Sequence, residues 1–256
     1  MASAQASFVA DAKASVWGPG GYQTKEYNQG TTTAAISAGA VNGSASGSSW
    51  GSLLSTHAYA EASASGAYSA QSYGRVQSID KLVATGSPTG GGTLRLGIRL
   101  GGTATGSFEG PMDPTKDWGL VAKSSVAIWV NSGLDFFETS YKIDRYNPTG
   151  TFTPFSTRDY IEIPFRNGQD LWLDTTVYAG VSILNGSGHG IADFSHTFEW
   201  TGLRSIVDDN GNAFTGYGLT SMSGEDYVQS VPEPTSIVAL GAGALALLKR
   251  RKRPRC

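Results

Sequence analysis

The clearest alternation of apolar and polar residues in the chain runs over Asp170-Leu-Trp-Leu-Asp-Thr-Thr-Val-Tyr-Ala-Gly-Val-Ser-Ile183. Successive side chains of a β-strand point to opposite faces, so its period of two predicts a strand with one buried face. The residues expected to face inward are Leu171, Leu173, Thr175, Val177, Ala179, Val181 and Ile183, and those expected outward are Asp170, Trp172, Asp174, Thr176, Tyr178 and Ser182. The stretch is one long strand, or two strands that share a bend near Gly180.

The same alternation recurs on both sides of this stretch. It runs over residues 94–100, 126–130, 161–165 and 194–200, and an Asp209-Asn210-Gly211 turn follows the last of these. About ten short strands separated by Gly, Pro and Asn turns, without a convincing amphipathic helix between them, predict an all-β fold. We expect an antiparallel β-sandwich, jelly-roll-like, with a closed barrel as the alternative.

The N-terminal part of the chain is rich in Ala, Ser, Gly and Thr. Residues 1–30 read as a leader, and the small-x-small pattern Ala2-x-Ala4 suggests the remnant of a signal-peptide end; a leader without a targeting role is the open alternative. From Ser7 to about Tyr73, small residues surround isolated aromatic residues without a fixed repeat, which suits tightly packed or edge strands. We therefore expect the sandwich domain over residues 31–229.

Composition and charge exclude several classes of protein. The 256 residues, 39% of them hydrophobic, can form one large all-β domain or two small ones. Of the 19 basic residues six follow Leu248, so thirteen precede Val231, against twenty acidic residues, which gives the body a charge of −7. An acidic body argues against nucleic acid as a partner. The single cysteine, Cys256, excludes an intrachain disulfide.

The C-terminal tail, residues 230–256, consists of three segments in series. A hinge, Val231-Pro232-Glu233-Pro234, precedes the apolar run from Ile237 to Leu248, and a basic cluster ends the chain. An apolar run followed by cations enters a bilayer and stops at the cytoplasmic side. At 1.5 Å per residue the run makes a helix of roughly 18 Å against roughly 30 Å of hydrocarbon, which favours a transient anchor. The membrane-embedded positions include Ile237, Leu240, Leu245 and Leu248, and the basic stop comprises Lys249, Arg250, Arg251, Lys252 and Arg253.

This tail resembles the PEP-CTERM sorting signal of Gram-negative bacteria. The resemblance implies that exosortase, an inner-membrane enzyme, recognises the tail and processes it near Pro232-Glu233-Pro234, so that the protein reaches the outer surface or the extracellular matrix. The segment from Ala192 to Tyr227 also resembles the last strands of PEP-CTERM cargo domains, which supports the sandwich and carries no known chemistry. The resemblance thus implies a route of export and leaves the activity of the body open.

Candidate metal ligands are better explained as structural residues. His189, Asp193 and His196 are close in sequence, but a strand would place His196 on the apolar face, Asp193 on the other face and His189 in a loop. Oxygen ligands at Asp208, Asn210 and Asn212 match a calcium loop only in part, and a hairpin turn explains them better. The segment from Asp113 to Asp117 likewise reads as a turn. We predict no metal site and no cofactor.

Catalytic residues are not indicated either. The carboxylates of Glu138, Asp159, Glu162 and Glu199 could serve glycoside hydrolysis, but no spacing places two of them in one cleft. A G-x-S-x-G elbow is absent, and Gly90-Gly91-Gly92-Thr93 lacks the following lysine of a phosphate-binding loop. We therefore predict a protein that is not an enzyme.

The strongest candidates for ligand binding are aromatic residues in outward positions. Trp129, Trp172 and Tyr178 fall on the polar side of their strands, where exposed rings can stack on sugars. The alternative is that the N-terminal segment or a second sheet covers them. Together with the tail, they predict an exported, non-catalytic surface or matrix protein associated with exopolysaccharide. The alternatives are a carbohydrate-binding β-sandwich module and a polysaccharide-active hydrolase.

Overall fold

The computed structural model describes residues 6–66, 68–85, 91–110, 119–130, 133–144, 147–154, 158–166, 168–213 and 218–228. These residues form strands and no helix. The strands are β1 (Ser7–Gly18), β2 (Gly21–Gly30), β3 (Thr33–Ala40), β4 (Gly43–Gly51), β5 (Ser55–Ala64), β6 (Ser69–Thr85), β7 (Gly91–Leu100), β8 (Thr103–Glu109), β9 (Gly119–Val130), β10 (Gly133–Asp144), β11 (Asn147–Thr153), β12 (Tyr160–Arg166), β13 (Asp170–Leu184), β14 (Ser187–Asp208) and β15 (Gly218–Ser221).

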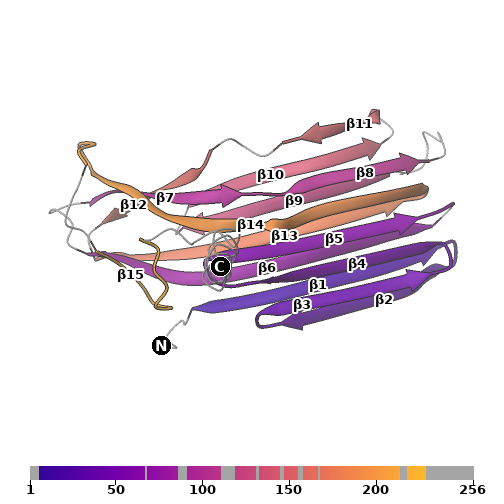
Figure 1. Ribbon diagram of the computed structural model, residues 1–256, viewed down its shortest axis with the longest axis horizontal. Coiled ribbons are helices and arrows are strands. Elements are labelled where there is room, and N and C mark those ends of the chain that lie inside the picture. Colours follow the sequence, from indigo (N-terminus) through magenta and orange to yellow (C-terminus); the bar gives the residue numbers. More distant parts are fainter. Residues whose placement is uncertain are drawn as a thin grey trace, which may run out of the picture.

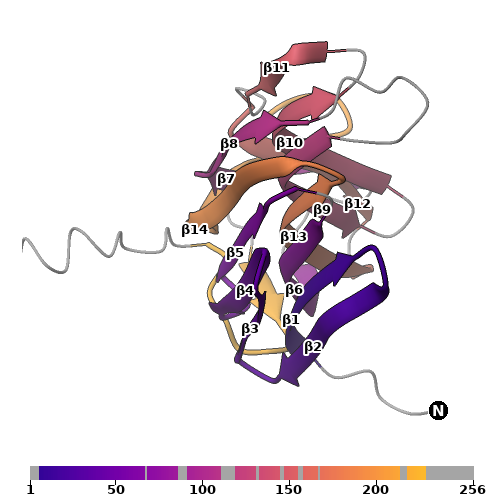
Figure 2. The same ribbon diagram turned by 90° about the vertical axis from the view of Figure 1, so that its right-hand side faces the viewer.

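The strands form two antiparallel sheets that pack face to face (Figures 1 and 2). Sheet A has eight strands in the order β11-β10-β9-β13-β6-β1-β2, with β15 paired to β6. Sheet B has seven in the order β12-β7-β14-β5-β4-β3, with β8 paired to β14. The prediction of an antiparallel β-sandwich is confirmed, and the order β13-β9-β10-β11 is that of a Greek key.

The stretch that predicted the fold is one continuous strand, β13, in the middle of sheet A. Its odd-numbered residues from Leu171 to Ile183 are all buried, and the even-numbered residues from Trp172 to Ser182, apart from Gly180, are half-buried on the opposite face. Most inward positions predicted in β7, β9 and β12 are buried as well, for example Leu96, Ile128 and Ile163, whereas Leu100 and Val130 are half-buried. These side chains join one core cluster between the sheets.

The core is much thinner between β1, β4, β5 and β6. The inward residues here are mostly alanine, including Ala12, Ala45, Ala60 and Ala70. A Cβ at Gly74 would lie 1.9 Å from the Ser48 carbonyl oxygen, so the two backbones touch. Small residues therefore bring the sheets together at this end, whereas leucine, isoleucine and aromatic residues fill the other end.

The N-terminal residues are part of the sandwich, which differs from the expected leader at 1–30. Strands β1 and β2 extend sheet A at its edge, and Ala10, Ala14 and Val16 of β1 are fully buried. Alanine is large enough to fill the core here because the opposite sheet is so close. The strand-forming region therefore begins at Ser7 rather than after residue 30.

Strand β14 departs from the predicted alternation in two places. Its register against β5 shifts between Phe194 and Phe198. Glu199 lies opposite Arg99 on the outer face, as predicted, although its side chain is buried. His189, predicted in a loop, lies within β14. The side chain of His196 lies outside the described residues.

The last described segment closes one end of the sandwich. Strand β15 pairs with β6, and the Tyr227 ring, only 3% exposed, packs edge-on to Trp200 of sheet B with the ring centroids 6.1 Å apart. The buried Asp80 carboxylate of sheet A accepts hydrogen bonds from the backbone N–H and the hydroxyl of Ser223. This segment therefore contacts both sheets just before the tail.

Candidate functional site

The tail residues lie outside the described residues. They are the hinge Val231, Pro232, Glu233 and Pro234, the apolar positions Ile237, Leu240, Leu245 and Leu248, and the basic residues Lys249, Arg250, Arg251, Lys252 and Arg253. Within the described residues, no helix is long and apolar enough to cross a membrane.

The two predicted tryptophans lie on the outer face of sheet A, which is the face turned away from sheet B. Trp129 of β9 is opposite Asp174 of β13, and Trp172 is two residues before Asp174. The two rings therefore occupy diagonal positions on neighbouring strands, about 7–8 Å apart at their backbones. Trp129 is 47% exposed, and the Lys81 ammonium lies 6.0 Å from the centre of the Trp172 ring. The N-terminal strands extend this sheet sideways rather than covering this face (Figure 2).

Tyr178 lies on the same face but in a different cluster. It is six residues beyond Trp172 on one strand, which is about 20 Å at 3.3 Å per residue. Its ring covers Gly180, because a Cβ at Gly180 would be 2.1 Å from the Tyr178 hydroxyl. Its neighbour is Tyr73 of β6, with the ring centroids 5.9 Å apart. The structure thus pairs the two tryptophans with each other and gives Tyr178 a partner that the sequence analysis missed.

An ion pair between a buried carboxylate and a partly exposed arginine lies beside the tyrosine cluster. Asp11 of β1 is 1% exposed, and the Arg75 guanidinium binds its Oδ2 atom at 2.6 and 2.8 Å. Burial and the charge of Asp11 raise the pKa of Tyr73, and burial raises the pKa of Tyr178. Both tyrosines therefore remain neutral and can donate hydrogen bonds. Nothing in the local sequence links Asp11 to Arg75, since only the pairing of β1 with β6 brings them together.

Polar side chains surround these rings on the outer face of sheet A. Gln77 donates hydrogen bonds to both oxygens of Asp174, at 3.0 and 3.1 Å. Lys81 pairs with Asp170 at 2.7 Å, and Lys123 pairs with Glu138 at 2.6 Å. The face therefore combines flat aromatic surface with partly exposed hydrogen-bonding groups.

The four carboxylates that could have served hydrolysis are each held in an ion pair. Glu138 binds Lys123, Asp159 binds Arg204 at 2.7 Å, Glu162 binds Arg95 at 2.8 Å and Glu199 binds Arg99 at 3.1 Å. A glycosidase needs two carboxyl groups that face one cleft at a defined separation. These four carboxylates are also divided between the two sheets.

A further polar cluster lies on the outer face of sheet B. Glu61 of β5 contacts His189 Nε2 at 2.9 Å through one oxygen and the Tyr59 hydroxyl at 2.7 Å through the other. The hydrogen bond with His189, and then that with Tyr59, lower the pKa of Glu61. The contact with His189 joins β5 to β14, and that with Tyr59 lies within β5, so both oxygens of the carboxylate are engaged.

The remaining candidate sites hold the backbone in place. The Asp208 carboxylate accepts hydrogen bonds from the backbone N–H groups of Asn210 and Asn212, at 2.9 and 2.8 Å, as a hairpin turn requires. These bonds lower the pKa of Asp208, with those from Asn212 contributing most. Over the part of the chain that the structure describes, no three metal-binding side chains cluster together. Asp113 and Asp117 lie outside the described residues.

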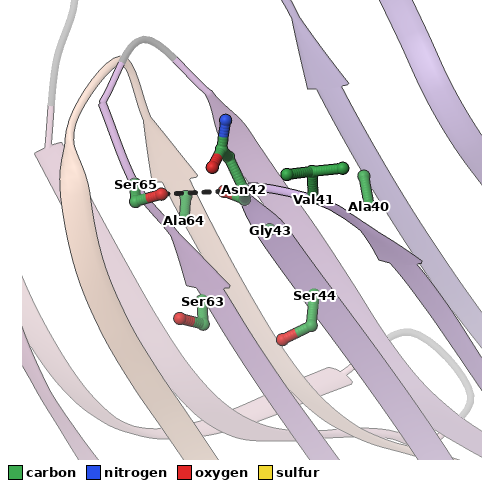
Figure 3. Close-up of a pocket in the computed structure, with 8 residues that line it drawn as sticks. All are labelled: Ala40, Val41, Asn42, Gly43, Ser44, Ser63, Ala64 and Ser65. Atoms are coloured by element: carbon green, nitrogen blue, oxygen red, sulfur yellow. Dashed lines mark hydrogen bonds between the residues drawn. The ribbon is translucent and has the colours of Figure 1, made fainter.

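A small hollow lies beside the β3–β4 turn (Figure 3). It measures about 280 Å³ and is lined by Ala40, Val41, Asn42, Gly43, Ser44, Ser63, Ala64 and Ser65. The Asn42 carbonyl accepts a hydrogen bond from the Ser65 hydroxyl at 3.4 Å. None of the lining side chains is charged or aromatic, so the hollow offers little to hold a ligand.

Fold and tail together define a class of protein, a β-sandwich that is exported with a C-terminal sorting segment. Comparison with protein-family models matches residues 230–253 to the PEP-CTERM protein-sorting motif. The chain therefore carries a PEP-CTERM sorting motif at its C-terminal end, which confirms the resemblance seen in the sequence. No curated protein and no solved structure matches the chain.

The sorting motif establishes the first part of the function. It marks an exported protein that its tail anchors in the membrane until exosortase cleaves it. The prediction of export through exosortase is thereby confirmed. The role of the sandwich after export is a separate question.

Proposed function

We propose that the protein is a non-catalytic component of the cell surface or extracellular matrix, whose sandwich binds extracellular polysaccharide through the outer face of sheet A. The observation that carries the proposal is the position of Trp129, Trp172 and Tyr178 on this one face. The sorting motif supports the route of delivery, and the aromatic face supports the ligand class.

Aromatic rings and polar groups suit sugars for complementary reasons. One face of a pyranose ring carries C–H groups that stack on an aromatic ring, and its hydroxyl groups exchange hydrogen bonds with the edge of the site. The outer face of sheet A has both kinds of group, with Tyr73 and Tyr178 beside Arg75 and with Trp172 beside Lys81. A broad sheet surface of this kind suits a long polymer better than a single sugar, because it spreads the contacts over several rings.

The ion pairs support a binding role over a hydrolytic one. Each carboxylate considered for hydrolysis has a cationic partner within 3.1 Å. These contacts hold each carboxylate against a cationic side chain of the protein itself. We therefore propose a role without turnover of the polysaccharide.

A glycan array probed with the full chain in mild detergent tests the proposal. We expect binding to one or more extended polysaccharides. Replacing Trp129, Trp172 and Tyr178 together by alanine should weaken it more than tenfold, since stacking contributes about 1 kcal/mol or more per ring. The matched control replaces Trp50 and Tyr59 by alanine on the outer face of sheet B, where affinity should stay within twofold.

Two results would contradict the proposal. Equal affinity of the triple variant and the wild type would show that the binding site is not on the outer face of sheet A. Steady release of reducing ends from a bound polysaccharide, abolished by one carboxylate-to-amide substitution, would show an enzyme instead.

A further inference from the structure

One row of residues crosses the whole outer face of sheet A at right angles to its strands. Strand pairing places the row in register, in the order Tyr27, Lys13, Tyr73, Gly180, Lys123, Ser140 and Thr153. Each of the strands β2, β1, β6, β13, β9, β10 and β11 contributes one residue. At about 4.8 Å per strand, the distance from Tyr27 to Lys123 is roughly 19 Å.

Aromatic rings and ammonium groups alternate along the first part of this row. Tyr27 is 54% exposed, and Tyr73 follows it beyond Lys13. At Gly180 the missing side chain is replaced by the Tyr178 ring, which lies over the glycine. The row continues with Lys123, whose side chain is 37% exposed although it pairs with Glu138. A ligand along the row therefore meets three tyrosines and two lysines.

The charge of this face differs from that of the body. Among the side chains that the structure describes here, the cations are Lys13, Arg75, Lys81, Lys123 and Lys142, and the acids are Asp11, Glu138, Asp170 and Asp174. Five cations against four acids leave the face slightly positive, whereas the body before Val231 carries −7. The negative charge of the body repels an anionic polymer, and this repulsion is weakest at this face because the face itself is slightly positive.

We infer that the row from Tyr27 to Lys123 binds an anionic polysaccharide, rich in uronic acid, whose chain runs across the strands. The tyrosines stack on its sugar rings, and Lys13 and Lys123 pair with its carboxylates. This inference rests on the proposed function, which it makes specific in ligand class and in direction.

Binding of the full chain to a polyuronate and to a neutral β-glucan, each at two salt concentrations, tests the inference. We expect tighter binding to the polyuronate, with a loss of about tenfold between 50 mM and 500 mM salt because exposed charges are screened. Lys13→Gln with Lys123→Gln should lower the affinity for the polyuronate about tenfold and leave binding to the neutral glucan unchanged. The matched control, Arg95→Gln on sheet B, should change neither.

Tyr27→Ala tests whether the polysaccharide runs across the strands. Tyr27 lies on the edge strand β2, about 14 Å from Gly180, so only a polymer running across the strands reaches both. We expect a loss of about fivefold or more, with an unchanged melting temperature because the ring is largely exposed. Unchanged affinity would overturn the crossing direction.

The outcomes separate this inference from the proposed function. Binding to the neutral glucan that equals or exceeds binding to the polyuronate, without dependence on salt, overturns the inference and leaves the proposed function standing. Binding to neither polymer, nor to any other polysaccharide on an array, overturns both.

Discussion

Gly74 is a residue at which the backbones of the two sheets touch. A Cβ there would lie 1.9 Å from the Ser48 carbonyl oxygen and 2.8 Å from that of Tyr59, and backbone atoms cannot move aside singly. We expect Gly74→Ala to lower the free energy of unfolding by about 2 kcal/mol or more, as overpacking does. The free energy is measured by urea denaturation.

Gly39 provides the matched control for this substitution. It lies in β3, and a Cβ there would meet nothing within 4 Å. Gly39→Ala should leave the stability unchanged or raise it by up to about 1 kcal/mol, because alanine has less freedom in the unfolded chain. Equal effects of the two substitutions would show that the sheets do not touch at Gly74.

The residues of the binding face differ in how far the sequence predicts them. Alternation in β13 placed Trp172 and Tyr178 outward correctly, since every second residue there is strongly apolar. Asp11, Arg75 and Tyr73 could not be predicted, because their proximity depends on the pairing of strands that are distant in sequence. The register shift in β14 and the burial of Glu199 on the outer face could not be predicted either, because no local pattern marks them.

At the scale of elements, the segment after β15 anchors the end of the body next to the tail. Tyr227 bridges the two sheets between Trp200 and Asp80, and burial and the charge of Asp80 raise its pKa. Tyr227→Ala should cost about 3 kcal/mol of stability by leaving a cavity. Val228→Ala, at a 38% exposed position, should cost less than about 0.5 kcal/mol.

Denaturation of both variants checks this prediction. A loss at Tyr227 as small as that at Val228 would mean that the segment is not anchored, and the tail would then leave the body from a loose end. If Tyr227→Ala costs more stability than Val228→Ala, as expected, the body is anchored at Tyr227, four residues before the hinge begins at Val231.

The contact between β5 and β14 predicts a dependence of stability on pH. The pKa of Glu61 is lowered in the folded protein, so the folded state binds fewer protons than the unfolded state. The stability that this group adds is therefore present above the ordinary pKa of a glutamate and is lost as the pH falls through the lowered value. Glu61 is 40% exposed, so the effect is small.

Thermal melts between about pH 6 and pH 3 measure this effect. Glu61→Gln should lose less stability over this range than the wild type, because glutamine does not titrate. Ser63→Ala, two residues away on the same face, should follow the wild type. A larger loss of stability with falling pH in Glu61→Gln than in the wild type would contradict the prediction.

The alanine-rich strands show why some elements escaped prediction. Residues 7–18 contain alanine at several inward positions, and alanine gives little contrast with the serine and glycine around it. The strongly apolar strands β7, β9, β12 and β13 were predicted because leucine, isoleucine and valine contrast with charged neighbours. The same small residues that weaken the sequence pattern are those that let the two sheets approach.

At the scale of the whole molecule, sorting separates two parts of opposite charge. The full chain has a charge of −2 and an isoelectric point near 5.9, whereas the residues before Val231 carry −7. Cleavage near Pro232-Glu233-Pro234 removes the six basic residues of the tail. The exported form should therefore focus well below pH 5.9.

Isoelectric focusing of the exported and the membrane fractions checks this prediction. The double variant Pro232→Ala with Pro234→Ala should accumulate in the membrane with the isoelectric point of the full chain. An exported form that keeps the isoelectric point of the full chain would show that the tail is retained.

We propose that the exported sandwich binds polysaccharide on the outer face of sheet A, and a crystal structure of the protein with a bound oligosaccharide is the decisive test. We expect the oligosaccharide to lie across β6 and β13, with sugar rings stacked on Tyr73 and Tyr178. An oligosaccharide bound on the outer face of sheet B, or in the hollow between Ala40 and Ser65, would contradict it.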